Sequence, residues 1–211
     1  DTSLVRAERV ASFSHKGALT LAQLHAMMEA NERVKYDSRR ADLLRVRNGL
    51  VLKFLYLTAA RRSEAAGLKW EDLQHDGAFK VVILRKTKSG ETQKIKLRDE
   101  LHQELVDWKS RLARSGVMSD WVFPSLGFRT LGRRMTGKGI NDIITRLGAA
   151  IGLEISAHYL RHTAITLALE LGEPLQKVQS YARHASVNTT IRYFHDQQLL
   201  EKNPTDRLPL I

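Results

Sequence analysis

Residues 79–97, with the sequence FKVVILRKTKSGETQKIKL, carry the clearest strand patterns in the chain. Residues 79–84 are β-branched and apolar, and residues 92–97 alternate polar with apolar side chains. Such runs are typical of β-strands, and the basic, glycine-containing segment 85–90 between them is typical of a hairpin tip. We therefore expect one small antiparallel sheet in this part of the chain.

Helical patterns occupy the sequence on both sides of that hairpin. Thr20 is suited to cap a first helix, a second follows Ser38, and a short third ends at Gly67 after the turn-like segment 58–60. Further helices are expected at about 99–114, 137–150, 156–171, 174–182 and 187–199. Because the strands are confined to one stretch, the pattern predicts a single α+β domain that is predominantly helical.

The charge balance is the unusual feature of the composition. The 211 residues include 34 Lys plus Arg against 23 Asp plus Glu, which gives a formal net charge of +11. Such an excess favours a polyanionic partner, and nucleic acid is the leading candidate. The chain has no cysteine, which excludes disulfides and thiolate metal sites. No apolar run is long enough for a membrane span, and residues 1–10 do not resemble a signal peptide.

Two basic positions follow from the local patterns. Arg61, in the segment TAARRSEA (58–65), lies at the expected start of a short helix, where a guanidinium can bind a phosphate in bidentate fashion. Lys88 lies at the hairpin tip beside Arg85 and Lys86, and this setting suits a phosphate backbone. Taken singly, each position is more typical of a solvated surface residue than of a phosphate site.

The segment SAHYLRHT (156–163) carries a stronger signal. His158 and Arg161 are three residues apart, so on a helix they share a face and can reach one phosphate. His158 and His162 are four apart, which leaves a metal site as an alternative. No Glu follows the first His, and Arg161 would place a cation inside such a site, so metal binding is disfavoured.

The segment YARHASVNTTIRY (181–193) contains the last two candidates, His184 and Tyr193. With Arg61, Lys88, His158 and Arg161, they resemble in order and spacing the signature of the tyrosine site-specific recombinases, the phage-integrase type. The matching segments resemble the family patterns T-G-x-R-x-S-E, T-K-[ST]-G, H-x-x-R-H-[ST] and G-H-x(4)-T-T-x-x-Y, and they span residues 19 to 195. Two positions depart from these patterns: Ala59-Ala60 displace the usual Gly before Arg61, and Arg183 replaces the Gly before His184.

The resemblance implies a fold, a reaction and a role for each candidate residue. The fold is the DNA breaking-rejoining catalytic domain with its small antiparallel sheet. Tyr193 would attack a DNA phosphate to form a 3′-phosphotyrosyl intermediate, without metal, ATP or cofactor. Among the other family positions, Arg61 and Arg161 would bind the phosphate oxygens, His158 would accept the tyrosine proton, and Lys88 would protonate the leaving 5′ oxygen. His184 would hydrogen-bond the phosphate, and Glu64 would orient the first arginine.

Other basic and polar side chains are expected to contact the DNA duplex. Arg183 would add a cation beside the site and a further phosphate contact. The remaining candidates are Arg62, Arg85, Lys86, Arg133, Arg134, Lys138 and Asn141. A solvated surface explains any one of them equally well.

The family resemblance also implies an organisation and partners. Residues 1–18 would be a linker from an N-terminal core-binding domain, 19–195 the catalytic domain, and 196–211 a C-terminal tail that docks on a neighbouring protomer. The expected partners are double-stranded DNA, a homo-tetramer on paired recombination sites, and accessory DNA-bending or directionality proteins. A bacterial cytoplasmic, DNA-associated location is expected, in service of a mobile genetic element and its integration.

Three other functions remain to be distinguished. A type IB topoisomerase would use the same chemistry but let one strand swivel. A non-catalytic DNA-binding module would not need the complete set of reacting groups. A metal hydrolase built on His158 and His162 would be sensitive to chelators.

Overall fold

The computed structural model describes residues 18–36, 39–85 and 92–183. Its elements in chain order are α2 (Leu21–Arg33), α3 (Ala41–Thr58), α4 (Arg62–Ala66), the 3₁₀ turn η1 (Trp70–Asp72), β1 (Leu73–Asp76), β2 (Phe79–Arg85), β3 (Thr92–Lys96), α5 (Asp99–Arg114), the 3₁₀ turn η2 (Phe128–Thr130), α6 (Gly137–Ala149), α7 (Ala157–Glu170) and α8 (Leu175–Ala182). The predicted predominantly helical α+β class is confirmed. The expected segments 1–17 and 187–199, and the tail 196–211, lie outside the described residues.

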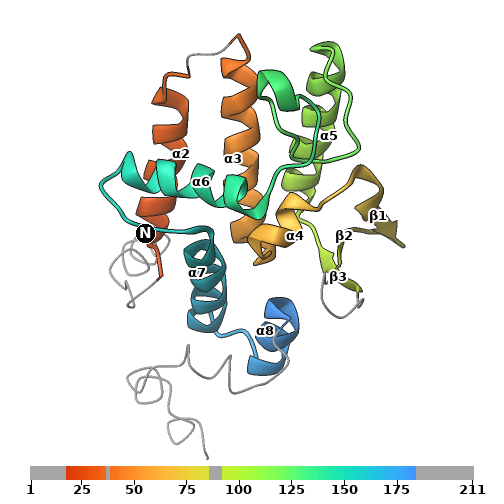
Figure 1. Ribbon diagram of the computed structural model, residues 1–211. Coiled ribbons are helices and arrows are strands. Elements are labelled where there is room, and N and C mark those ends of the chain that lie inside the picture. The colour runs from red at the N-terminus through yellow and green to blue at the C-terminus, as the bar shows by residue number, and fades with distance from the viewer. Residues whose placement is uncertain (1–17, 37–38, 86–91, 184–211) are drawn as a thin grey trace, which may run out of the picture.

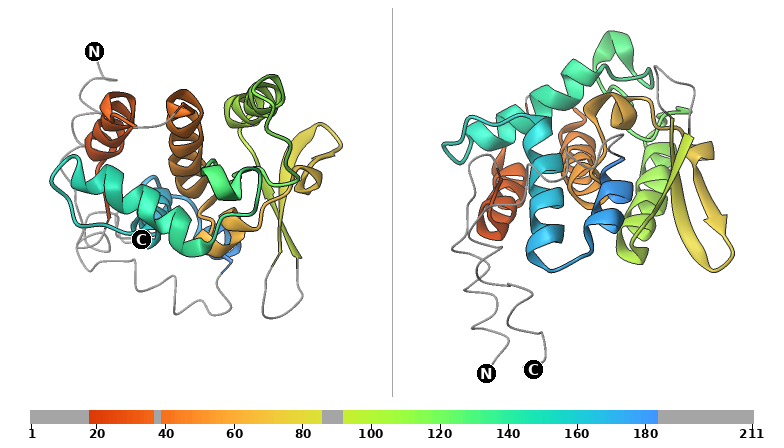
Figure 2. Two further views of the ribbon diagram at one scale, coloured as in Figure 1. Left: turned by 45° about the horizontal axis from the view of Figure 1, so that its top comes forward. Right: turned by 90° about the horizontal axis from the view of Figure 1, so that it is seen from below.

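Three helices, α2, α3 and α5, lie side by side in a row (Figure 2, left). Helix α2 begins at the predicted cap, because the Thr20 hydroxyl accepts a hydrogen bond from the Gln23 N–H at 3.1 Å. Helix α3 is the central member of the row, and its Phe54 and Leu55 are fully buried. Trp108 of α5 is also buried, and its indole N–H donates to the Val122 carbonyl at 2.8 Å. Helix α3 therefore forms the base on which the other elements pack.

The sheet has three strands rather than the two expected from the sequence. Strands β2 and β3 pair antiparallel as predicted, and β1 adds to the other side of β2 with Leu73 opposite Val82. The sequence of β1, LQHD, has an exposed, polar pattern that carries no strand signal of its own. Its pairing with β2 decides its conformation. The sheet lies beside α5 in both views (Figures 1 and 2).

Helices α6 and α7 bring the C-terminal part of the chain onto this base. Helix α6 crosses from α2 to α4, and α7 packs against α3 (Figure 1). Helix α8 contacts α7, and the two form a second apolar cluster with Ala59 at the end of α3. This arrangement places the start of α4, the start of α7 and the end of α8 close to one another.

None of the helices in the described part of the chain is both long enough and apolar enough to cross a membrane.

Candidate active site

The turn between α3 and α4 fixes the position of Arg61. Ala59 ends α3 with φ of 47°, and Arg61 is the residue that precedes the first turn of α4. The Glu64 carboxylate accepts two hydrogen bonds from Arg61, one from its backbone N–H at 2.8 Å and one from Nη1 at 2.9 Å. Glu64 is buried, whereas the Arg61 side chain is 43% exposed. The buried carboxylate therefore fixes Arg61 on its protein side, and part of the guanidinium stays accessible to a ligand.

The first turn of α7 carries His158 and Arg161 on one face, as their spacing predicted. The Ser156 side chain does not cap this helix. Instead, the Asn141 side-chain oxygen on α6 accepts a hydrogen bond from the Ala157 N–H at 3.0 Å. Asn141 was expected to contact DNA, and the structure shows that its oxygen holds the helix start that presents His158.

Arg161 is buried and connects two distant parts of the chain. Its Nη1 donates to the Ala59 carbonyl at 2.5 Å, and its Nη2 donates to the Ala182 carbonyl at the end of α8. One guanidinium thus joins the end of α3, the start of α7 and the end of α8. Because these contacts fix the side chain before any ligand arrives, little ordering remains to be done on binding.

These residues line a common pocket of about 400 Å³, which we call the arginine pocket. Its lining consists of Ala60, Arg61, Arg62, Ser63, Asn141, Ser156, Ala157, His158 and Arg161. No carboxylate is among these described lining residues, and the positive end of the α7 dipole adds to the arginine charges. Such a site is suited to an anion with several oxygens, such as a phosphate.

The charges in the arginine pocket act on His158. Its partial burial lowers the pKa of the imidazole below the usual 6.5, and the neighbouring Arg161 and Arg61 lower that pKa further. The neutral imidazole, which can accept a proton, is therefore favoured at neutral pH.

Arg183, expected to add a phosphate contact, is placed away from the open side of the arginine pocket. This residue ends α8 with φ of 57°, and its side chain is buried rather than presented to a ligand. Its Nη2 donates to Glu64 at 3.0 Å and to the Ala59 carbonyl at 2.7 Å. Unlike Arg161, Arg183 is not among the residues that line the arginine pocket, and its Nη atoms donate to acceptors of the protein. Burial lowers the pKa of Arg183, and the Glu64 carboxylate opposes that effect.

The other expected DNA-contacting residues occupy three settings. Arg62 lines the arginine pocket, and Arg133 is exposed. Arg85 and Arg134 line a neighbouring hollow of about 200 Å³, where Arg85 pairs with Asp72 at 2.6 Å. Lys138 pairs with Asp142 on the exposed side of α6 at 2.8 Å. Both side chains of the Lys138–Asp142 pair are exposed, so Lys138 remains able to exchange its partner for a phosphate. Asp72 is buried, so Arg85 is held by a carboxylate that needs its charge.

Four predicted residues, Lys86, Lys88, His184 and Tyr193, lie outside the described residues. His184 directly follows Arg183, which ends the described C-terminal part. The structure therefore brings together Arg61, His158 and Arg161 from the predicted set, together with Glu64.

The alternative metal site gains no support from the geometry. His162 lies within 3.2 Å of the Thr166 hydroxyl through its Nδ1, whereas His158 lines the arginine pocket. Within the described ranges, no group of three or more His, Cys, Asp or Glu side chains is placed to hold a metal ion.

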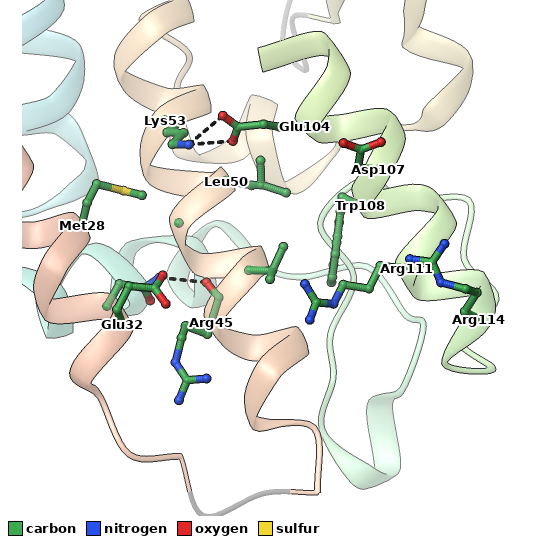
Figure 3. Close-up of a pocket in the computed structure, with 13 residues that line it drawn as sticks. Met28, Glu32, Arg45, Leu50, Lys53, Glu104, Asp107, Trp108, Arg111 and Arg114 are labelled. Atoms are coloured by element: carbon green, nitrogen blue, oxygen red, sulfur yellow. Dashed lines mark hydrogen bonds and ion pairs between the residues drawn. The ribbon is translucent and has the colours of Figure 1, made fainter. Parts of the chain in front are cut away.

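A second hollow of about 300 Å³ lies between α2, α3 and α5, and we call it the α2–α3–α5 hollow (Figure 3). It is lined by both signs of charge. Lys53 of α3 and Glu104 of α5 extend toward each other across it and meet at 2.7 Å. Other charged side chains around it are Glu32, Arg45, Asp107, Arg111 and Arg114.

Sequence reasoning missed three features of the site. The Ala59 carbonyl accepts from two arginines, Asn141 caps α7, and Arg183 shares Glu64 with Arg61. The departure from the family glycine at these turns was the one visible signal. Ala59 and Arg183 are the non-glycine residues with positive φ in the described ranges, and each occupies a position where the family pattern has Gly.

The domain combines a three-stranded antiparallel sheet with a helical body, and two arginines and a histidine line one pocket between its helices. This is the class of domain that the sequence pattern predicted. The model of the phage integrase family matches residues 18–199. The chain belongs to this family.

Several curated relatives are tyrosine recombinases. The chain is 31% identical over 165 residues to a tyrosine recombinase of Synechococcus elongatus, which covers 77% of this chain and 51% of that protein. It is 36% identical over 154 residues to the recombinase XerD of Mycobacterium tuberculosis, with 71% of this chain and 48% of that protein covered. The chain spans about half the length of these relatives.

Solved structures show the same fold. The pre-cleavage complex of the XerH site-specific recombinase with difH substrate matches with a TM-score of 0.72 at 24% identity, over 92% of this chain and 55% of that one. A lambda integrase dimer bound to a COC′ core site matches with a TM-score of 0.61 at 17% identity, over 85% of this chain and 48% of that one. The predicted tyrosine-recombinase catalytic-domain fold is confirmed.

Proposed function

We propose that this chain is the catalytic domain of a site-specific DNA recombinase, an integrase that cuts and rejoins DNA strands through a 3′-phosphotyrosyl intermediate. The observation that carries the proposal is the arginine pocket. Arg61 and Arg161 line this pocket, and no carboxylate is among its described lining residues. His158 also lines it, and the neutral form of its imidazole is favoured. The relatives are named recombinases, and two of the similar structures hold their DNA sites. These names favour recombination over topoisomerase-like relaxation.

The pocket residues have defined roles in this reaction. Arg61 and Arg161 bind the two non-bridging phosphate oxygens and stabilise the charge that develops in the pentacoordinate transition state. Because Arg161 is held by two backbone carbonyls and Arg61 by Glu64, the two guanidiniums need little reorganisation as the charge forms.

The proton and bond changes follow from the same proposal. His158 accepts the proton of the Tyr193 hydroxyl while the phenolic oxygen attacks phosphorus. The bond from phosphorus to the 5′ oxygen breaks, and Lys88 gives that oxygen a proton, while His184 donates a hydrogen bond to the phosphate. The new phosphotyrosyl ester conserves the bond energy, so rejoining by a free 5′ hydroxyl requires no ATP, and the arginines supply the positive charge that a metal would otherwise provide.

The partners belong to the same proposal. Residues 19–195 act as the catalytic domain on double-stranded DNA, and a homo-tetramer assembles on paired sites with its residues 196–211 docked between protomers. The similar lambda integrase structure is a dimer bound to its core site, which supports assembly on DNA. Accessory DNA-bending or directionality proteins and a cytoplasmic place of action complete the proposal.

Covalent trapping on DNA tests the function. The chain is incubated at low salt, with a chelator present, with a library of randomised duplexes that carry a nick, so that the short 5′-hydroxyl product diffuses away after cleavage. We expect SDS-resistant adducts whose peptide maps to Tyr193, and none with Tyr193→Phe. Recovery and sequencing of the trapped DNA then give the target site.

Two outcomes would contradict the proposal. One is the absence of any adduct while the chain demonstrably binds the duplexes. The other is an adduct that persists in the Tyr193→Phe variant.

A further inference from the structure

Arg183 occupies a position that gives its guanidinium four protein acceptors. The side chain is 1% exposed. Its Nη1 donates to the carbonyls of Thr58 at 3.0 Å and Tyr181 at 3.1 Å. Its Nη2 donates to the Ala59 carbonyl at 2.7 Å and to Glu64 at 3.0 Å. The end of α8 is thereby fastened to the turn that carries Arg61.

Two of these acceptors are shared with the arginines of the pocket. The Ala59 carbonyl accepts from Arg161 Nη1 as well as from Arg183. The Glu64 carboxylate accepts from Arg61 through Oε1 and from Arg183 through Oε2. Arg183 therefore contacts a partner of Arg61 and a partner of Arg161 at the same time.

The position is not one that stability alone would select. Arg183 has φ of 57°, a left-handed conformation that disfavours side chains other than Gly, and its buried Nε lacks a hydrogen-bond acceptor among the described residues. Three guanidiniums also gather around the single carboxylate of Glu64 and the Ala59 carbonyl, so their mutual repulsion opposes close packing. A bound phosphate would offset this excess of positive charge.

We propose that Arg183 is a positioning residue, which sets Arg61 and Arg161 at the separation that a phosphate requires by gripping the Glu64 carboxylate and the Ala59 carbonyl. This inference rests on the proposed function. Arg183 is the last residue of the α8 cap and directly precedes His184. The positions of Arg61 and Arg161 therefore depend on the end of α8 being packed against the Ala59 turn.

A purely structural role is the competing explanation, and the chain offers a matched control for it. The Tyr181 hydroxyl also fastens α8 to α3, by donating to the carbonyls of Tyr56 at 3.2 Å and Leu57 at 3.0 Å. These two carbonyls are not the ones that Arg161 and Arg183 contact, and neither belongs to Glu64. Tyr181→Phe therefore loosens the same junction without removing a contact to Glu64 or Ala59.

The experiment compares Arg183→Gly, Arg183→Lys and Tyr181→Phe with the unmodified chain. Adduct formation on the nicked duplex is measured at saturating DNA, together with DNA affinity and Tm. Glycine suits the left-handed backbone, so Arg183→Gly is expected to fold and to lower the cleavage rate by about 10- to 100-fold, the scale of a small misplacement of reacting groups. DNA affinity should change by less than about 3-fold, because the arginines still carry their charge.

Two further readouts separate positioning from structure. Free guanidinium ion, well below concentrations that unfold the chain, should restore part of the rate of Arg183→Gly and none in Tyr181→Phe. Arg183→Lys should fall between the unmodified chain and Arg183→Gly, since one ammonium cannot reproduce the planar fork that serves Ala59 and Glu64. If Arg183→Gly does not fold, Arg183→Lys carries the comparison with Tyr181→Phe.

The outcomes distinguish this inference from the proposed function. Adducts with the unmodified chain, combined with an unchanged rate in the Arg183 variants, overturn the positioning role alone. The same holds if the Arg183 variants and Tyr181→Phe all lose cleavage rate only in proportion to their loss of Tm. No adduct with the unmodified chain overturns both.

Discussion

The arginine pocket and the α2–α3–α5 hollow contrast in how their charges are matched. In the hollow, both cations and carboxylates line the space, and Lys53 and Glu104 form an ion pair there (Figure 3). In the arginine pocket, Arg61, Arg161 and His158 line the space, and the Glu64 carboxylate that holds Arg61 is buried and is not among the lining residues. A concave surface binds an anion when its cations lack an internal counter-charge on the open side. The size of the two spaces is similar, so charge pairing is what separates them.

The largest expected effect on the cleavage rate comes from a substitution at Arg161. Arg161→Lys keeps the charge but loses the fork that holds Ala59 and Ala182, so we expect cleavage to fall by about 10²- to 10³-fold. Arg111→Lys, the matched change beside the α2–α3–α5 hollow, should leave the rate unaltered. Adduct formation on the nicked duplex measures both. A loss of less than about 10-fold in Arg161→Lys would be incompatible with a preorganised arginine pocket.

A change in the wall of the α2–α3–α5 hollow should affect stability rather than chemistry. Trp108→Ala removes a fully buried side chain and leaves a cavity, so we expect the free energy of unfolding to fall by about 3–5 kcal/mol. Urea denaturation measures this loss, with Val106→Ala on the exposed side of α5 as the control. The cleavage rate per folded molecule should not change. A rate that falls with Trp108→Ala at constant folded fraction would show that the two regions are coupled.

The charge of the arginine pocket should show in a titration of His158. Burial, Arg161 and Arg61 lower its pKa below 6.5, so acidification through that lower range should protonate it and reduce cleavage. The unfolded chain binds the proton at higher pH, so the stability contributed by the neutral form is also lost as the pH falls through the same window. NMR titration of the imidazole should show the lowered pKa, and Arg61→Gln should move it upward. An unchanged His158 pKa in that variant would remove Arg61 from the list of causes.

The smallest expected effect concerns the ion pair across the α2–α3–α5 hollow. Both side chains of the Lys53–Glu104 pair are about one-third or more exposed, so a double-mutant cycle should give only about 0.2–1 kcal/mol. The coupling should weaken as salt rises, because exposed charges are screened. A coupling well above this range would indicate that the pair is a principal tie between α3 and α5. DNA cleavage should be insensitive to either substitution.

Much of the fold could be predicted because its signals are local. Helix α5 was expected at 99–114 and is found at Asp99–Arg114, since its apolar residues repeat with helical spacing and acidic residues occupy its first turn. Strand β1 could not be predicted, because its polar residues gain strand conformation only from pairing with β2. The expectation of a two-stranded hairpin was therefore incomplete.

The candidate site divides in the same way. The shared face of His158 and Arg161 follows from a spacing of three residues on a helix. The contact between Arg183 and Glu64 joins residues 119 positions apart, and no local pattern indicates that Arg183 is buried. An arginine on the surface and an arginine buried against a carboxylate cannot be told apart from the sequence, so the more common surface position was predicted.

The sequence by itself determined the helical class, the hairpin, the family and the order of the candidate groups, because periodicity, capping and motif spacing act over a few residues. The tertiary structure decided which cations face an open space and which are used internally. Packing of α7 and α8 onto α3 excludes water around the Ala59 turn. A buried polar group without a partner costs free energy, and Glu64 and the Ala59 carbonyl both accept hydrogen bonds from Arg183 at the end of α8, while Arg61 remains partly exposed.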